Sequence, residues 1–155
     1  MNNDDKIMMT KANAQLFELA DTITDNNYDI YSYVASKIFN KTYEECCEMI
    51  EHKWNPTGKV MRDIAKYICI NRSSVDDLSN TYKIPNLKQL VVDAFPFTFP
   101  EDIDDDDVSD DIDDRCGAAT TFLIALTGHV RFILFYERNC RTLQRLRKLT
   151  HIGEA

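Results

Sequence analysis

Three cations follow Gly58 at a spacing that fits one side of a helix. Lys59, Arg62 and Lys66 lie three and four residues apart, and side chains at these spacings are neighbours on a helix surface. Such a cluster suits the oxygens of a phosphate or of a partner's carboxylates. The three residues are therefore candidate phosphate-binding residues, and a solvated basic face is the plainer interpretation.

The densest charge in the sequence is the acidic run at residues 101–115, EDIDDDDVSDDIDDR. It holds ten acids and one arginine, so it carries a charge of −9 in a chain whose net charge is −8. The acidity is therefore local, and the other 140 residues together carry about +1. Eight aspartates of the run are the candidate partner-binding residues: Asp104, Asp105, Asp106, Asp107, Asp110, Asp111, Asp113 and Asp114.

Three functions compete with a solvated, flexible linker for this run. A dense row of carboxylates can compete with nucleic acid for a groove lined by Lys and Arg, because DNA presents regularly spaced negative charge. The run can instead pair with the basic residues 137–155 of its own chain, whose net charge is +3. Calcium binding is disfavoured, because a calcium loop has glycine at its sixth position and closes with glutamate, and the run has neither.

No residues at the spacing of a metal or catalytic centre stand out. The five cysteines form no C-x-x-C pair, and their odd number fits reduced thiols in a cytoplasm. His129 has no second histidine or cysteine at metal-ligand spacing. Without a nucleophile–base pair, a glycine-rich phosphate loop or a metal cluster, we expect a non-enzymatic protein with no catalytic residue, metal or cofactor.

The elements that position these residues are expected to be helices. Four glycines and four prolines in 155 residues give few turn signals, and a chain of this length can close one hydrophobic core. We expect an all-α, compact single-domain bundle of six or seven helices over residues 1–155, with 101–115 as an exposed acidic loop. Helix starts are predicted at Thr10, Asp29, Thr42, Gly58, Ser73 or Ser74, and Pro85.

Local patterns refine these helices. Residues 25–27, Asp-Asn-Asn, are expected to end the first helix, and Thr42 with Glu45 forms the pattern of a capping box. In the helix after Gly58, the fourfold spacing of Val60, Ile64 and Ile68 predicts the buried stripe.

Residues 118–136, AATTFLIALTGHVRFILFY, form a long apolar stretch of 19 residues. That length is just sufficient to span a membrane, but Arg131 lies past its middle, where a charge is costly. A buried central helix without membrane contact is therefore expected within residues 116–155. A separate last helix follows, with Leu143, Leu146 and Leu149 on one face and arginines on the other, which suits the acidic run, an acidic partner or nucleic acid.

Residues 29–100 carry short motifs in a defined order. They are D-I-Y-x-x-V-A-S-K-I-F-N from Asp29, Y-E-E-C-x-E from Tyr43, and N-P-x-G-K-x-x-R-x-x-x-K from Asn55. The stretches SVDDL from Ser74 and LVVDAFPFTFP from Leu90 follow. In order and spacing, this series resembles the fingers region of phage A-family DNA polymerases.

The resemblance implies roles for two of the cations. In that family the Arg and Lys of R-x-x-x-K hold the triphosphate of the incoming nucleotide, and by position these are Arg62 and Lys66. The family's Tyr-Gly beyond the lysine is replaced by Ser74 and Val75, and the carboxylate motifs that hold two catalytic metal ions are missing. The resemblance therefore implies descent from a fingers region without polymerase activity.

These observations lead to one expectation and two alternatives. The expectation is a phage-type, non-catalytic inhibitor in the cytoplasm of an infected cell. It would bind and block a host nucleic-acid-binding protein, such as a CRISPR effector nuclease, through the acidic run. The first alternative is an accessory nucleotide- or DNA-binding module based on Arg62 and Lys66. The second is a viral helical bundle that holds a partner's amphipathic helix, with the architecture of Bcl-2-like proteins. The sequence leaves the oligomeric state open.

Overall fold

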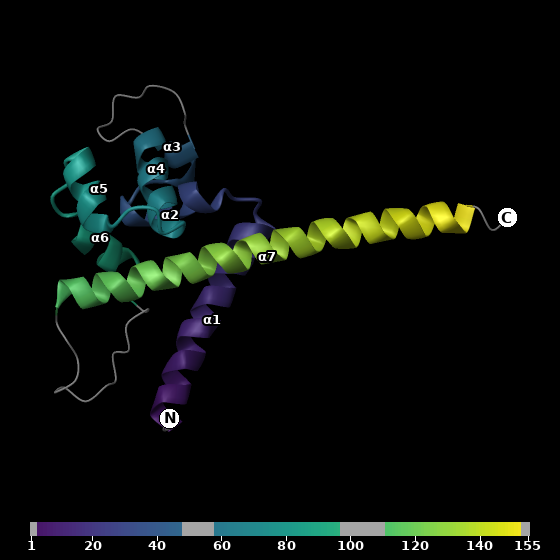
Figure 1. The fold of residues 1–155 in the computed structure, drawn as a ribbon, viewed down its shortest axis with the longest axis horizontal. Coiled ribbons are helices and arrows are strands. Elements are labelled where there is room, and N and C mark those ends of the chain that lie inside the picture. Colours follow the sequence, from purple (N-terminus) through teal and green to yellow (C-terminus); the bar gives the residue numbers. More distant parts are fainter. Residues whose placement is uncertain (1–2, 48–57, 97–110, 153–155) are drawn as a thin grey trace.

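The computed structural model describes residues 3–47, 58–96 and 111–152, and this part of the chain contains seven α-helices and no strand (Figure 1). Side chains are described for residues 13–47, 58–96 and 111–148. The all-α prediction is therefore confirmed. The helices are α1 (Asn3–Asp25), α2 (Ile30–Ile38), α3 (Tyr43–Cys47), α4 (Gly58–Cys69), α5 (Val75–Tyr82), α6 (Leu87–Ala94) and α7 (Ile112–Ile152).

Local capping determines where several helices begin. Asp29 caps α2 with its side chain, and the hydroxyl of Ser74 caps α5 by accepting a hydrogen bond from the backbone N–H of Asp77 at 3.1 Å. Thr42 and Glu45 form the predicted capping box, in which each backbone N–H donates to the other side chain at 3.1 Å. These starts confirm the sequence pattern, because such caps depend on residues within one turn.

Asparagines end three of the helices in the left-handed backbone region. Asn27, Asn40 and Asn71 have φ angles of 54°, 51° and 55°, and asparagine tolerates this conformation better than most residues. The predicted end of the first helix is confirmed, since α1 stops at Asp25. The predicted start at Thr10 is wrong, because α1 begins at Asn3 and continues through that residue.

The core forms where α2 packs on α4 and where α6 and α7 pack on each other. Val34 of α2, Ile64 of α4 and Leu123 of α7 are fully buried. Of the predicted stripe on α4, Ile64 and Ile68 are buried and Val60 is half-buried. Residues 29–96 thus supply most of one side of the core, and α7 closes it.

α7 runs through 41 residues without a break. Its first half lies against α1, α4 and α6, and its second half projects beyond the bundle (Figure 1). The prediction of two separate helices in this region is therefore wrong. The predicted acidic loop is also shorter at its C-terminal end, because Asp113 and Asp114 belong to the first turn of α7.

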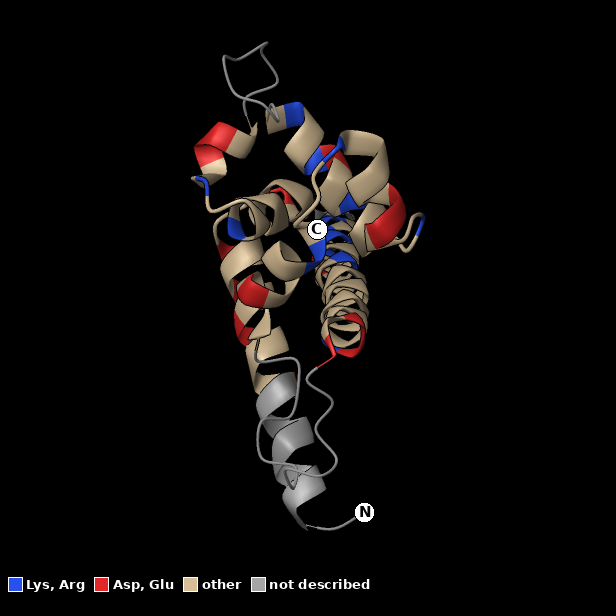
Figure 2. Cartoon of the chain, turned by 90° about the vertical axis from the view of Figure 1, so that its left-hand side faces the viewer, with Lys and Arg blue, Asp and Glu red and all other residues tan. Residues whose placement is uncertain are grey.

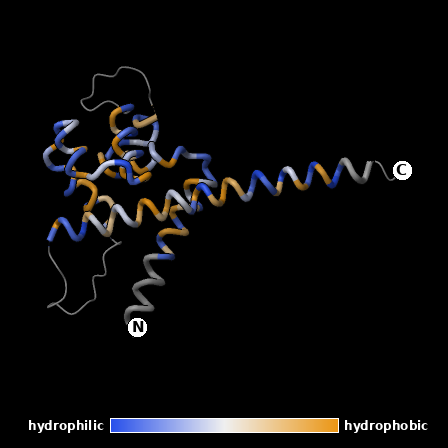
Figure 3. Tube along the Cα trace, viewed as in Figure 1, coloured by the Kyte–Doolittle hydropathy of each residue, from blue (hydrophilic) through white to orange (hydrophobic). Residues whose placement is uncertain are grey.

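The apolar stretch in α7 is buried only in part. Leu126 and Val130 are buried, but Phe132, Phe135 and Tyr136 are 62–63% exposed. Figure 3 shows hydrophobic segments continuing along α7 past the bundle. The expectation of a buried helix over residues 118–136 therefore fails for its last turn, where no other described element covers these side chains.

Candidate functional site

The described part of the acidic run lies at the N-terminal end of α7. The Asp111 carboxylate accepts a hydrogen bond from the backbone N–H of Asp113 at 3.0 Å. Asp113 and Asp114 are exposed in the first helical turn, where negative charge interacts favourably with the helix dipole. Figure 2 shows this acidic end of α7, with basic residues farther along the same helix. The other five candidates, Asp104, Asp105, Asp106, Asp107 and Asp110, lie outside the described residues.

Lys88 of α6 joins this acidic end to α5. Its Nζ atom lies 2.8 Å from a carboxylate oxygen of Asp76 and also pairs with Asp113. The hydrogen bonds with Asp113 and Asp76 raise the pKa of Lys88, so it stays charged. Asp113 is therefore held by an internal cation, and that cation comes from α6.

Pairing of the described acids with the basic end of the same chain is excluded by the continuity of α7. A helix rises about 1.5 Å per residue, which places Arg138 roughly 36 Å from Asp114 along one rigid rod. The internal-pairing alternative from the sequence is thus corrected for Asp111, Asp113 and Asp114, and Asp113 pairs with Lys88 of α6 instead.

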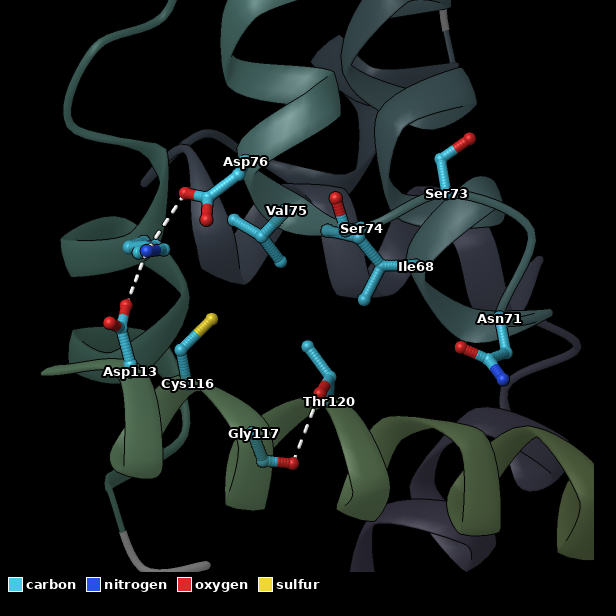
Figure 4. A pocket seen from close by; sticks show the side chains of 11 residues that line it. Ile68, Asn71, Ser73, Ser74, Val75, Asp76, Asp113, Cys116, Gly117 and Thr120 are labelled. Atoms are coloured by element: carbon cyan, nitrogen blue, oxygen red, sulfur yellow. Dashed lines mark hydrogen bonds and ion pairs between the residues drawn. The ribbon is translucent and has the colours of Figure 1, made fainter.

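A hollow of about 320 Å³ lies beside the Lys88 bridge, between α7 and the start of α5 (Figure 4). Most of its polar side chains already have partners: the Ser74 hydroxyl caps α5, and the Thr120 hydroxyl donates to the Gly117 carbonyl at 3.0 Å. Burial raises the pKa of the Cys116 thiol, which therefore stays protonated at neutral pH. The lining of the hollow offers no nucleophile–base pair.

Arg62, the central candidate of the basic cluster, forms a bridge between α4 and α2. Its Nε atom donates to an Asp29 carboxylate oxygen at 2.7 Å, and its guanidinium lies 5.3 Å from the ring centroid of Tyr31. Burial favours a higher pKa for Asp29, but the hydrogen bonds from Arg62 and Ser32 and the charge of Arg62 outweigh it, so the pKa is lowered. Arg62 is therefore engaged in holding two helices together.

The two lysines of the cluster are more accessible than Arg62. Lys59 is exposed and Lys66 is half-buried on the same helix. The structure thus brings the three candidates to one side of α4, as their spacing predicts, but the middle cation already has a carboxylate partner. A phosphate at this site would have to replace Asp29 as the partner of Arg62.

The part of the chain that the structure describes contains no arrangement of side chains for binding a metal ion or for thiol catalysis. No group of three His, Cys, Asp or Glu side chains there is placed to hold a metal ion. All five cysteines are unpaired, and burial raises the pKa of Cys46 and Cys69 to about 11. These two thiols are protonated, buried residues.

The outward side of α7 is a surface that the sequence analysis missed. We define the outward face as the side of α7 that lies opposite the buried Leu123, Leu126 and Val130. It runs from Gly117 to Leu146, and its residues recur at intervals of three or four positions. By length and composition, residues 112–148 could also cross a membrane, but a core helix of a soluble protein passes the same test. The signal available in the sequence was a spacing of three or four residues. It joins Thr121, Ile124 and Gly128 and continues through Phe132 and Phe135.

Comparisons with known proteins add no relative. No family model, no curated protein and no solved structure matches this chain. The resemblance to polymerase fingers therefore stays a prediction.

Proposed function

We propose that this protein is a non-catalytic, phage-type inhibitor that acts in the cytoplasm of an infected cell. It binds and blocks a host nucleic-acid-binding protein, such as a CRISPR effector nuclease, through its acidic run. The observation that supports the proposal is the density of charge: ten acids within 15 residues, ending in the exposed Asp111, Asp113 and Asp114.

The spacing of these acids is close to that of a nucleic acid strand. An extended chain advances about 3.4 Å per residue, so the eight acids of residues 101–111 would present one charge about every 5 Å in that conformation, and Asp113 and Asp114 follow in the first turn of α7. A DNA strand presents one phosphate about every 3.4 Å. A groove that binds phosphates through Lys and Arg would therefore accept the run as a competitor, and salt would weaken the complex.

Neutralising the first part of the run tests this proposal. Changing Asp104, Asp105, Asp106 and Asp107 to Asn should reduce capture of the target from host lysate, and inhibition of it, by at least tenfold. The reason is that four charges are lost from the surface that faces the target. Asp113 is left unchanged because it pairs with Lys88. The measurement is a pull-down washed at low and high salt, followed by an activity assay on the captured protein.

A second variant with the same change in net charge provides the control. Glu18, Asp21, Asp25 and Glu44 are exposed acids on α1 and α3, and their amide counterparts should leave capture unchanged. Equal loss of binding in both variants would mean that only overall charge matters. Full inhibition by the four-Asn variant would reject the acidic run as the binding surface.

The nucleotide-binding alternative has a less favourable site. Because Arg62 pairs with Asp29 at 2.7 Å, we expect titration with deoxynucleoside triphosphate and Mg²⁺ to give no saturable binding below about 1 mM, a weak affinity of about −4 kcal/mol. Isothermal titration calorimetry is the measurement. Saturable binding that disappears in the Lys66→Ala variant would contradict this expectation and restore the alternative.

A further inference from the structure

The outward face of α7 is exposed but almost without charge. Between Arg115 and Glu137, α7 carries a single residue with a full charge, Arg131, and its guanidinium donates a hydrogen bond to the Tyr31 hydroxyl of the bundle. Phe132 and Phe135 on this face are 63% and 62% exposed. A soluble protein seldom leaves a contiguous apolar strip of this kind uncovered.

Side-chain size changes along the outward face. Its first half carries mostly small residues, Ala118, Thr121 and Gly128, with Ile124 as the large exception, whereas its second half carries Phe132 and Leu143. A Cβ atom added to Gly117 or Gly128 would meet nothing within 4 Å, so the space above the small half is open. The small half therefore has room for large side chains from another molecule.

Charge changes along α7 in the same direction. The helix begins with Asp113 and Asp114 and carries Arg138, Arg145 and Arg147 near its other end. Within one copy these ends cannot meet, because they are separated by roughly 50 Å of helix. Between two copies that run in opposite directions, each acidic end lies beside a basic end.

We infer that the outward face of α7 binds the same face of a second copy of this chain, with the two helices antiparallel and residue 130 near the two-fold axis. In this register Phe132 of one copy lies over Gly128 of the other, and Leu143 lies over Ala118. Asp114 of one copy lies beside Arg147 of the other. This inference does not rest on the proposed function: of the acidic run, its contacts use only Asp114, in the first turn of α7.

A parallel arrangement fits these residues less well. It would place Gly128 against Gly128 and Phe132 against Phe132. The glycines would bring the two helices close together, whereas the phenylalanines one turn away would push them apart, and one straight pair of helices cannot satisfy both. It would also place acid beside acid at one end and arginine beside arginine at the other, which costs free energy. The antiparallel arrangement sets large on small at positions 128 and 132 and at 118 and 143, and acid beside base at the ends, while Ile124 of one copy lies level with Phe135 of the other.

The part of the fold that the structure describes leaves this face accessible. The side chains that hold α7 on the bundle, including Ala119, Leu123 and Leu126, are fully buried on the opposite side. Phe17 of α1 lies at the margin of the face, with its ring centroid 4.9 Å from that of His129, and is 50% exposed. It therefore adds apolar surface beside the second helix.

The mass of the full chain in solution is the first test. At about 50 µM, sedimentation velocity should give a particle of twice the 18.0 kDa chain mass. The Phe132→Glu, Phe135→Glu double variant should be monomeric with unchanged helix content, because both side chains are exposed in a single copy. The control is Arg141→Glu, which changes an exposed side chain on the opposite side of the same helical arm and should leave the dimer intact. A monomeric wild type, or a dimer that survives the double variant, would overturn the inference.

A size exchange tests the register. Gly128→Leu should leave the melting temperature of the monomer unchanged or higher, because leucine favours a helix over glycine and the site is open. It should nevertheless raise the dimer dissociation constant at least tenfold, by colliding with Phe132 of the second copy. Phe132→Ala alone should also weaken the dimer, and the combined variant should recover most of the affinity. Purely additive losses would reject the proposed pairing of positions 128 and 132.

Cross-linking tests the direction of the two helices. In an Arg147→Lys variant, a zero-length carboxyl–amine cross-linker applied to a mixture of isotopically light and heavy chains should join position 147 to Asp111 or Asp114 of another copy. Within one chain these positions are too far apart, so the mixed-isotope peptide identifies a contact between copies. Cross-links restricted to bundle residues in the dimer would overturn the antiparallel arrangement.

Discussion

Replacing Phe95 with alanine is expected to lower the free energy of unfolding by about 3–5 kcal/mol, the range typical of a buried Phe→Ala change. Phe95 is 2% exposed at the end of α6, and its ring centroid lies 6.3 Å from that of Phe122 on α7. The substitution leaves a cavity between α6 and the helix that closes the core. Chemical denaturation followed by circular dichroism at 222 nm measures the change.

Phe132→Ala is the matched control for this measurement. It removes the same atoms from a side chain that is 63% exposed, and in dilute protein it should change the free energy of unfolding by less than about 0.5 kcal/mol. Similar losses from both substitutions would mean that Phe95 is not part of the core described above, or that Phe132 is covered within one copy.

The features that the sequence predicted best are those decided by neighbouring residues. The capping box of Thr42 and Glu45 and the cap at Ser74 each involve residues three apart, so their chemistry is visible in a short stretch. The start of α4 at Gly58 follows from the change to a fourfold apolar spacing. The all-α class follows from several such elements in succession.

The features that were missed depend on distant residues or on what lies outside the chain. Arg62 is 33 residues from Asp29, so their pairing cannot be inferred from spacing along one helix, and the resemblance to polymerases suggested a phosphate instead. The apolar composition of residues 118–136 indicated burial correctly for Leu123 and Leu126. Composition does not distinguish a side chain that faces the core from one that faces another molecule, which is why Phe132 was misplaced.

Replacing Asp29 with alanine is expected to lower the free energy of unfolding by about 2 kcal/mol at pH 7. The carboxylate of Asp29 caps α2 by accepting hydrogen bonds from the backbone N–H and hydroxyl of Ser32 at 3.1 and 2.8 Å. It also accepts the 2.7 Å hydrogen bond from Arg62 of α4. The loss therefore affects both the start of α2 and its attachment to α4. Thermal and urea denaturation at fixed protein concentration measure it.

Asp29→Asn separates the two contributions. Asparagine is as good an N-cap as aspartate, so this variant keeps the cap and loses the charge that faces Arg62. We expect it to cost about 1 kcal/mol, since the Asp29 side chain is 36% exposed and water screens the pair. In the Arg62→Gln background the same substitution should cost much less, because the partner charge is already gone.

The pH dependence of this difference follows from the direction of the pKa shift. Folding lowers the pKa of Asp29, so the folded state favours the carboxylate, and this stabilisation is fully present above the unfolded value of about 3.9. It is lost as the pH falls through the folded pKa, because the protonated side chain no longer attracts Arg62. The stabilities of the wild type and the Asp29→Asn variant should therefore converge as the pH falls through the folded pKa of Asp29. A difference that stays constant between pH 7 and pH 3 would show that the charge of Asp29 contributes nothing.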